Sequence, residues 1–112
     1  MVIKYYATSG GKNTIYEYID SLSIKEKKAI YAILENLKEI GMKYLEILNT
    51  RQLKDNLWEI KYKQNRLMYV LVTKDNMYIL HACKKQKDKA EKQELEKALR
   101  RQKELKEAIK NK

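Results

Sequence analysis

The part of the chain that most constrains its fold is residues 57–85, which read as β-strands joined by tight turns. The strands are predicted at residues 57–63, 66–74 and 77–85, with two-residue turns at 64–65 and 75–76. Each turn contains an asparagine, a residue that tolerates the positive φ of tight hairpin turns. We therefore expect two consecutive β-hairpins at the centre of the fold.

These turns predict which side chains share a face of the sheet, because side chains alternate along a strand. The first face is expected to lie against the core, and its residues are Trp58, Ile60, Tyr62, Leu67, Tyr69, Leu71, Tyr78, Leu80 and Ala82. The second face is expected to be cationic, and its residues are Glu59, Lys61, Lys63, Arg66, Met68, His81, Cys83 and Lys85. With these turns, Arg66 lies opposite Lys63 on one side and Lys85 on the other. A slip of one residue would move a whole strand to the opposite face, so the cationic face depends on the turn assignment.

The segments before the hairpins predict a strand and two helices. Residues 2–8 read as a strand, and residues 15–22 have the apolar spacing of a short amphipathic helix. A second helix is expected to begin with the capping box of Ser23 and to end at Gly41. These two helices can cover the apolar face of the sheet.

The remaining segments complete the expected fold class. Residues 88 to 109 predict a last helix whose apolar stripe is narrow, so we expect it to pack by one edge. Residues 42–56 are ambiguous, and we assign them only to a connection. The sequence therefore predicts an α+β fold with a small antiparallel sheet of about four strands, mixed at its edge, packed on two N-terminal helices. The expected order is β-α-α-β-β-β-α within a single domain, residues 1–112.

The composition indicates the cellular compartment and the kind of partner that we expect. The only cysteine is Cys83, so no intrachain disulfide can form, and the chain has no run of about 18 apolar residues and no leader pattern. We expect a cytoplasmic protein that does not enter a membrane. The net charge is +10, and residues 84–112 carry 12 Lys and Arg against 6 Asp and Glu. This asymmetry favours a polyanion or an acidic protein as partner, although a lysine-rich solubilising surface has the same composition.

Two kinds of phosphate chemistry are disfavoured. Residues 9–14, Ser-Gly-Gly-Lys-Asn-Thr, lack the first glycine of a phosphate loop and read better as a turn with a helix cap at Asn13 or Thr14. One histidine and one cysteine cannot supply a zinc site, and Glu59 is the only carboxylate expected on the cationic face. We therefore expect no metal ion and no cofactor.

The chemistry that remains is cleavage of RNA by its own 2′-hydroxyl, which needs a base, an acid and fixed positive charge at the phosphate. Arg66 suits the phosphate, and Lys61, Lys63 or His81 could move a proton. The three lysines expected to bind flanking phosphates are Lys84, Lys85 and Lys87. The alternative reading is a packed histidine and a solvated lysine face.

Four motifs resemble the phage-derived, HigB-like branch of the RelE/ParE toxin superfamily. In chain order they are Leu57-Trp-Glu-Ile-Lys-Tyr, Asn65-Arg-Leu-Met-Tyr, Leu80-His-Ala-Cys-Lys-Lys and Glu96-Lys-Ala-Leu-Arg-Arg. The resemblance covers roughly residues 53–105 and implies an α+β toxin of a type II toxin-antitoxin pair. It implies that Arg66 is catalytic, that Lys61 and Lys63 are the basic residues of the preceding strand, and that the third strand ends in a functional His-x-x-Lys-Lys. The chain departs from the pattern at Ala82-Cys83, where glycine and an aromatic residue are usual, at Lys61, where arginine is usual, and in lacking a C-terminal tyrosine.

Three hypotheses follow from the resemblance. The leading one is a metal-independent, ribosome-dependent messenger-RNA endoribonuclease that inhibits translation and is neutralised by a small antitoxin, expected to carry a helix-turn-helix domain. A second is a ParE-like inhibitor of DNA gyrase, which would leave transcripts intact and disturb supercoiling. A third is a non-catalytic module that binds RNA or protein, which would not arrest growth.

Overall fold

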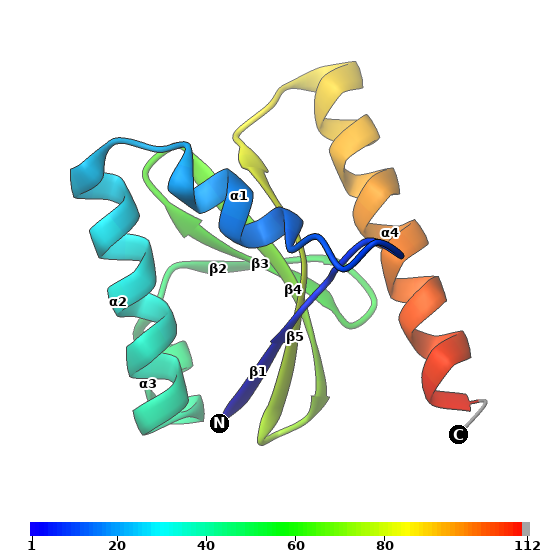
Figure 1. Ribbon diagram of the computed structural model, residues 1–112, viewed down its shortest axis with the longest axis horizontal. Coiled ribbons are helices and arrows are strands. Elements are labelled where there is room, and N and C mark those ends of the chain that lie inside the picture. The colour runs from blue at the N-terminus through cyan, green and yellow to red at the C-terminus, as the bar shows by residue number, and fades with distance from the viewer. Residues whose placement is uncertain (111–112) are drawn as a thin grey trace.

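The computed structural model describes residues 1–110 and contains a five-stranded sheet with helices on both faces (Figure 1). In chain order the elements are β1 (Val2–Tyr5), α1 (Thr14–Asp20), α2 (Ile24–Ile40), α3 (Met42–Ile47), β2 (Thr50–Lys54), β3 (Leu57–Tyr62), β4 (Asn65–Thr73), β5 (Asn76–Lys84) and α4 (Asp88–Lys110). The strand order is β1-β5-β4-β3-β2, and β1 is parallel to β5 while the other pairs are antiparallel. The predicted α+β class with a mixed edge is confirmed.

The N-terminal helices begin and end where their capping residues predict. The Asn13 side chain accepts hydrogen bonds from the backbone N–H of Ile15 and Tyr16, at 3.1 and 3.0 Å, and so caps α1. Ser23 caps α2 by accepting from the N–H of Glu26 at 3.3 Å. The helix ends at Gly41, whose φ of 78° favours glycine.

Residues 42–56, predicted only as a connection, form helix α3 and strand β2. The side chain of Leu45 is buried in the core below α2, which holds the short helix in place. Leu53 is the only apolar residue of strand β2, so apolar and polar residues do not alternate there in the sequence. Its pairing with β3 extends the sheet by one strand and brings Arg51 beside Glu59.

The first hairpin turns at Lys63 and Gln64, not at 64–65 as predicted. Lys63 adopts a φ of 53°, and Arg66 therefore lies opposite Lys61. Asn65 is buried and begins β4, because its side chain accepts a hydrogen bond from the hydroxyl of Tyr18 at 2.6 Å. The register differs from the predicted one by two residues, so each side chain of β3 keeps its predicted face.

The second hairpin turns at residues 74–75, and Arg66 lies opposite Cys83 instead of the predicted Lys85. A β-bulge interrupts the pairing, since Met68 pairs with His81 but the next residue, Tyr69, pairs with Ile79. Leu80 is the extra residue, and it packs on the same side of the sheet as Met68. Its predicted face is wrong because strict alternation does not hold across a bulge.

Both faces of the sheet carry apolar clusters, so the prediction of one core face and one cationic face is wrong. The larger cluster lies between the sheet and the N-terminal helices. The smaller one lies under α4, and its buried members are Leu57, Met68, Val70, Leu80, Cys83 and Ala98. The buried residues of α4 are Ala98 and Gln102, which agrees with the prediction that this helix packs by one edge. Within residues 1–110, every helix is too short or too polar to span a bilayer.

Candidate functional site

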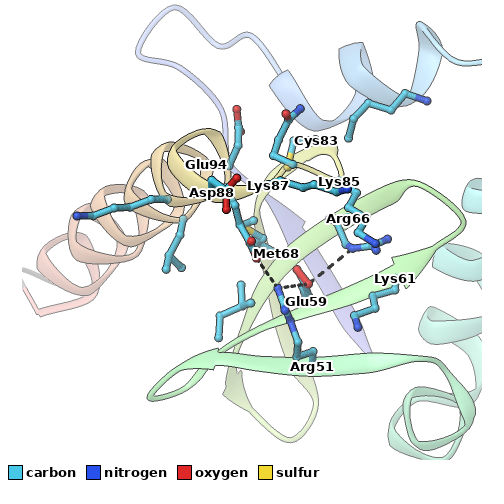
Figure 2. Close-up of a pocket in the computed structure, with 16 residues that line it drawn as sticks. Arg51, Glu59, Lys61, Arg66, Met68, Cys83, Lys85, Lys87, Asp88 and Glu94 are labelled. Carbon is cyan, nitrogen blue, oxygen red and sulfur yellow. Dashed lines mark hydrogen bonds and ion pairs between the residues drawn. The ribbon is translucent and has the colours of Figure 1, made fainter.

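Helix α4 covers only part of the sheet face on which it packs. The uncovered part forms a hollow of about 520 Å³ (Figure 2). Its walls come from β2, β3, β4, the end of β5, the following loop and the first turns of α4. Basic residues of the strands face carboxylates of the helix across this space. The volume is in the range of small-molecule and nucleotide sites, about 300 to 1,000 Å³.

Arg66 lies at the wall of the hollow with its guanidinium held on two sides. Its Nη1 donates hydrogen bonds to the backbone carbonyls of Lys63 and Asn65, both at 2.9 Å. Its Nε is 3.7 Å from Oε1 of Glu59, and the side chain is only 12% exposed. Among residues 1–110, Nη2 of Arg66 has no hydrogen-bond partner, so this nitrogen remains available for an anion in the hollow.

Glu59 lies below Arg66 and is 1% exposed. Its Oε1 is 3.0 Å from Nη2 of Arg51, and Arg51 also donates to Oε1 of Glu91 at 3.0 Å. Figure 2 shows these contacts as a chain from Arg66 through Glu59 and Arg51 to the helix. The hydrogen bond from Arg51 to Glu91, together with the charge of Glu59, raises the pKa of the Arg51 guanidinium. Strands β2, β3 and β4 and helix α4 are thus connected by alternating charges.

The predicted basic residues divide into those that line the hollow and those that do not. The ones that line it are Lys61, Arg66, Lys84, Lys85 and Lys87. Lys63 is in the turn, with its Nζ 5.8 Å from the centre of the Tyr62 ring, and does not line the hollow. Lys84 is also 3.9 Å from a carboxylate oxygen of Glu26 in α2.

His81 is 7% exposed beneath α4, not on an open cationic face as predicted. Nη1 of Arg101 lies 3.1 Å from its Nδ1 and also donates to the carbonyl of Leu80 at 2.9 Å. A guanidinium only donates, so Nδ1 of His81 accepts, and the ring proton is on Nε2, from which it is donated to Glu94. Burial lowers the pKa of His81 below its ordinary value of 6.5, so the ring is neutral at pH 7. With both nitrogens occupied inside the protein, His81 does not reach the hollow.

Glu94 is the carboxylate of α4 that joins His81 to the hollow. Its side chain is 24% exposed and lines the hollow, while Oε2 accepts the hydrogen bond from His81. Burial pushes the pKa of Glu94 upward, but the hydrogen bond from His81 and the charge of Lys97 outweigh burial, and the pKa is lowered. Burial and the neighbouring Glu94 raise the pKa of the Cys83 thiol to about 12, so this sulfur is not a nucleophile at neutral pH.

The donor atoms of His81, Cys83 and Glu94 lie within 4.8 Å of one another, which is a donor set that zinc accepts elsewhere. A histidine that binds a metal through Nε2 normally donates its Nδ1 proton to an acceptor. Here Nδ1 faces the donor Arg101, so the proton sits on the nitrogen that would have to bind the metal. The arrangement fits a hydrogen-bonded cluster better than a set of metal ligands.

Three functional side chains were missed because they come from elements whose placement the sequence does not specify. Arg51 belongs to β2, in the segment predicted as a connection. Glu91 and Glu94 are three residues apart near the start of α4, a spacing that puts them on one side of the helix. The prediction that Glu59 is the only carboxylate on this face is therefore wrong, because α4 adds its own carboxylates to the hollow.

The family model described as Phage derived protein Gp49-like (DUF891) matches residues 17–103, a segment that includes every residue lining the hollow. The comparison with curated proteins gave no match.

Proposed function

This chain belongs to the phage-derived Gp49-like family, the HigB-like toxins of the RelE/ParE superfamily, and on that premise we propose that it is an endoribonuclease that cuts messenger RNA on the ribosome. Cleavage uses the 2′-hydroxyl of the RNA as nucleophile and needs no metal ion. The observation that carries the proposal is Arg66, immobilised at the wall of a nucleotide-sized hollow with one guanidinium nitrogen unpaired among residues 1–110.

The hollow has residues suited to binding the phosphates and to protonating the leaving group. Nη2 of Arg66 binds a non-bridging oxygen of the scissile phosphate and stabilises the negative charge that builds up there. Lys61, directly opposite Arg66 on β3, carries an ammonium that can protonate the leaving 5′-oxygen. Lys84, Lys85 and Lys87 follow one another along the rim and bind the flanking phosphates.

A toxin family implies a cognate antitoxin, and we propose a small protein with a helix-turn-helix domain as that partner. The proposed substrate is messenger RNA, so the open side of the hollow must accept a single strand. The basic excess of residues 84–112 supports docking against ribosomal RNA.

The experiment that tests the proposal is induction of the chain in cells without its antitoxin, with the 5′ ends of cellular RNA mapped before and after induction. Wild type is expected to arrest growth and to create new ends within translated messages. Arg66→Ala is expected to abolish both effects while remaining folded by circular dichroism. Lys74→Gln, in the turn at the far end of the second hairpin, is the control and is expected to behave as wild type.

The other outcomes identify the alternative functions. Growth arrest with intact transcripts and altered plasmid supercoiling would show a gyrase inhibitor and refute the ribonuclease. Full expression without growth arrest would show a non-catalytic binding module.

A further inference from the structure

We propose that Glu94 is the general base of the reaction, and that His81 and Arg101 are positioning residues that aim its carboxylate into the hollow. The inference rests on the proposed ribonuclease function and transfers the proton-accepting role from the strand residues to helix α4.

The carboxylates that line the hollow differ in their partners. Glu59 is buried between two guanidinium groups, and Glu91 is bound by Arg51. Each of these carboxylates is already in contact with a guanidinium group, which takes up an oxygen that would otherwise face a hydroxyl in the hollow. The hydrogen bond to Glu94 comes instead from a neutral imidazole, so its negative charge is kept. A carboxylate has about four lone-pair positions, and His81 takes one of them.

The carboxylate of Glu94 is held in a fixed orientation by a chain of hydrogen bonds. Arg101 fixes the tautomer of His81, and His81 in turn fixes the carboxylate of Glu94. Arg101 is itself held by the carbonyl of Leu80, the bulged residue of β5, and its guanidinium stacks 4.2 Å from the centre of the Tyr6 ring. A base held by a second group that is itself oriented by a third is the arrangement that acid-base catalysis requires.

Glu94 and Arg66 line the same hollow. Cys83 pairs with Arg66 across β4 and β5, and the thiol of Cys83 lies beside Glu94. Cys83 is thus a neighbour of both Glu94 and Arg66 on the wall of the hollow. A phosphate held by Arg66 brings the adjacent ribose toward Glu94.

The reaction then balances as follows. The 2′-hydroxyl gives its proton to Glu94 as the 2′-oxygen forms a bond to phosphorus. The bond from phosphorus to the 5′-oxygen breaks, and that oxygen takes a proton from the ammonium of Lys61. The products are a 2′,3′-cyclic phosphate and a 5′-hydroxyl end, and solvent restores both protonation states.

The direct test is single-turnover cleavage by purified toxin on ribosomes programmed with an mRNA that carries a cut site mapped in cells. Glu94→Gln keeps the size of the side chain but cannot accept the proton, and we expect its rate to fall roughly 10² to 10⁴-fold. Glu96→Gln, on the exposed side of the same helix, is the matched control and is expected to cut at the wild-type rate. Thermal unfolding of both variants shows whether the fold is retained.

The positioning role has its own readout. His81→Leu removes the hydrogen-bond donor to Glu94 and places an apolar side chain beside its carboxylate, so the pKa of Glu94 rises. As the pH is lowered, the cleavage rate of this variant therefore begins to fall at a higher pH than that of wild type. The groups that face Glu94 are His81 and Cys83 from β5 and Lys97 from α4. Arg101 contacts His81 on its other nitrogen, and Arg66 of β4 lies elsewhere on the wall of the hollow. His81→Gln retains an N–H donor and is expected to restore most of the rate and the wild-type pH profile.

Each outcome decides between the two proposals. Cleavage by Glu94→Gln within threefold of wild type would overturn Glu94 as the base and leave the ribonuclease proposal standing. A wild-type toxin that cuts nothing on ribosomes would overturn both. If Glu94→Gln fails to fold, Glu94→Ala serves instead, and cleavage by that variant within threefold of wild type would likewise overturn the role. Identical pH profiles for His81→Leu and wild type would refute the positioning role.

Discussion

Replacing Glu59 by glutamine is expected to loosen Arg66 and to lower both stability and activity. Glutamine has nearly the same size, so the change removes the negative charge and little else. In wild type this charge lies 3.0 Å from Nη2 of Arg51 and 3.7 Å from Nε of Arg66. Without it, two guanidinium groups face each other across a buried neutral side chain.

The magnitude follows from how exposed each partner is. Removing one member of a fully buried ion pair costs about 3 to 5 kcal/mol. The side chain of Arg51 is 47% exposed and keeps its hydrogen bond to Glu91, so water and Glu91 compensate it. The side chain of Arg66 is 12% exposed and keeps only neutral carbonyl partners. We therefore expect a loss of about 2 kcal/mol in the free energy of unfolding, below the range for fully buried pairs because Arg51 is compensated.

Urea unfolding measures this loss. With an m-value of about 2 kcal/mol/M, the midpoint of Glu59→Gln moves down by roughly 1 M and the slope is unchanged. Glu96→Gln, an exposed substitution of the same type, is expected to change the free energy of unfolding by less than about 0.5 kcal/mol. Single-turnover cleavage by Glu59→Gln is expected to fall at least tenfold, because Arg66 loses one of its fixed contacts. A midpoint and a rate equal to those of the control would refute the idea that Glu59 holds Arg66.

Three further predictions concern stability. Tyr18→Phe removes the hydrogen bond to buried Asn65, and we expect a loss of about 1 to 2 kcal/mol in urea unfolding; no loss would mean that Asn65 does not need this donor. Leu80→Ala removes most of a fully buried side chain at the bulge and is expected to lower the free energy of unfolding by about 2 to 5 kcal/mol. A loss below about 1 kcal/mol in urea unfolding would place Leu80 outside the cluster under α4. The pKa of His81 is lower in the folded chain, so the folded state binds fewer protons, and its contribution to stability is complete above the unfolded pKa near 6.5 and is lost as pH falls toward the folded value. His81→Gln is expected to flatten this part of the stability curve, and an unchanged curve would contradict a buried neutral ring.

The elements that local chemistry controls were predictable. Ser23 and Gly41 bound α2 because a capping side chain and a positive φ act within a few residues. The three long strands were predicted for the same reason, since their β-branched and aromatic residues alternate over short distances. The role of Asn65 was not predictable, because its partner Tyr18 is 47 residues away in the sequence.

The geometry of the candidate site depends on contacts between residues that lie farther apart in the sequence than those that determine the strands. Local turn chemistry favoured a turn containing Asn65, whereas burial against α1 makes this residue the first of β4. The bulge at Leu80 puts this side chain and His81 on the same face, and α4 then covers both. No pattern within the strands specifies where a C-terminal helix docks. The burial of His81 and the position of Glu94 beside it could therefore not be predicted from the sequence.

We propose above that the hollow around Arg66 cuts RNA through the 2′-hydroxyl of its substrate. The most direct measurement uses ribosomes programmed with two mRNAs that differ by one atom, the 2′-oxygen of the nucleotide on the 5′ side of the mapped cut. We predict that wild type cuts the all-ribose message and leaves the 2′-deoxy message intact, and that Arg66→Ala cuts neither. Equal cleavage of both messages, or undiminished cleavage by Arg66→Ala, would contradict the claim.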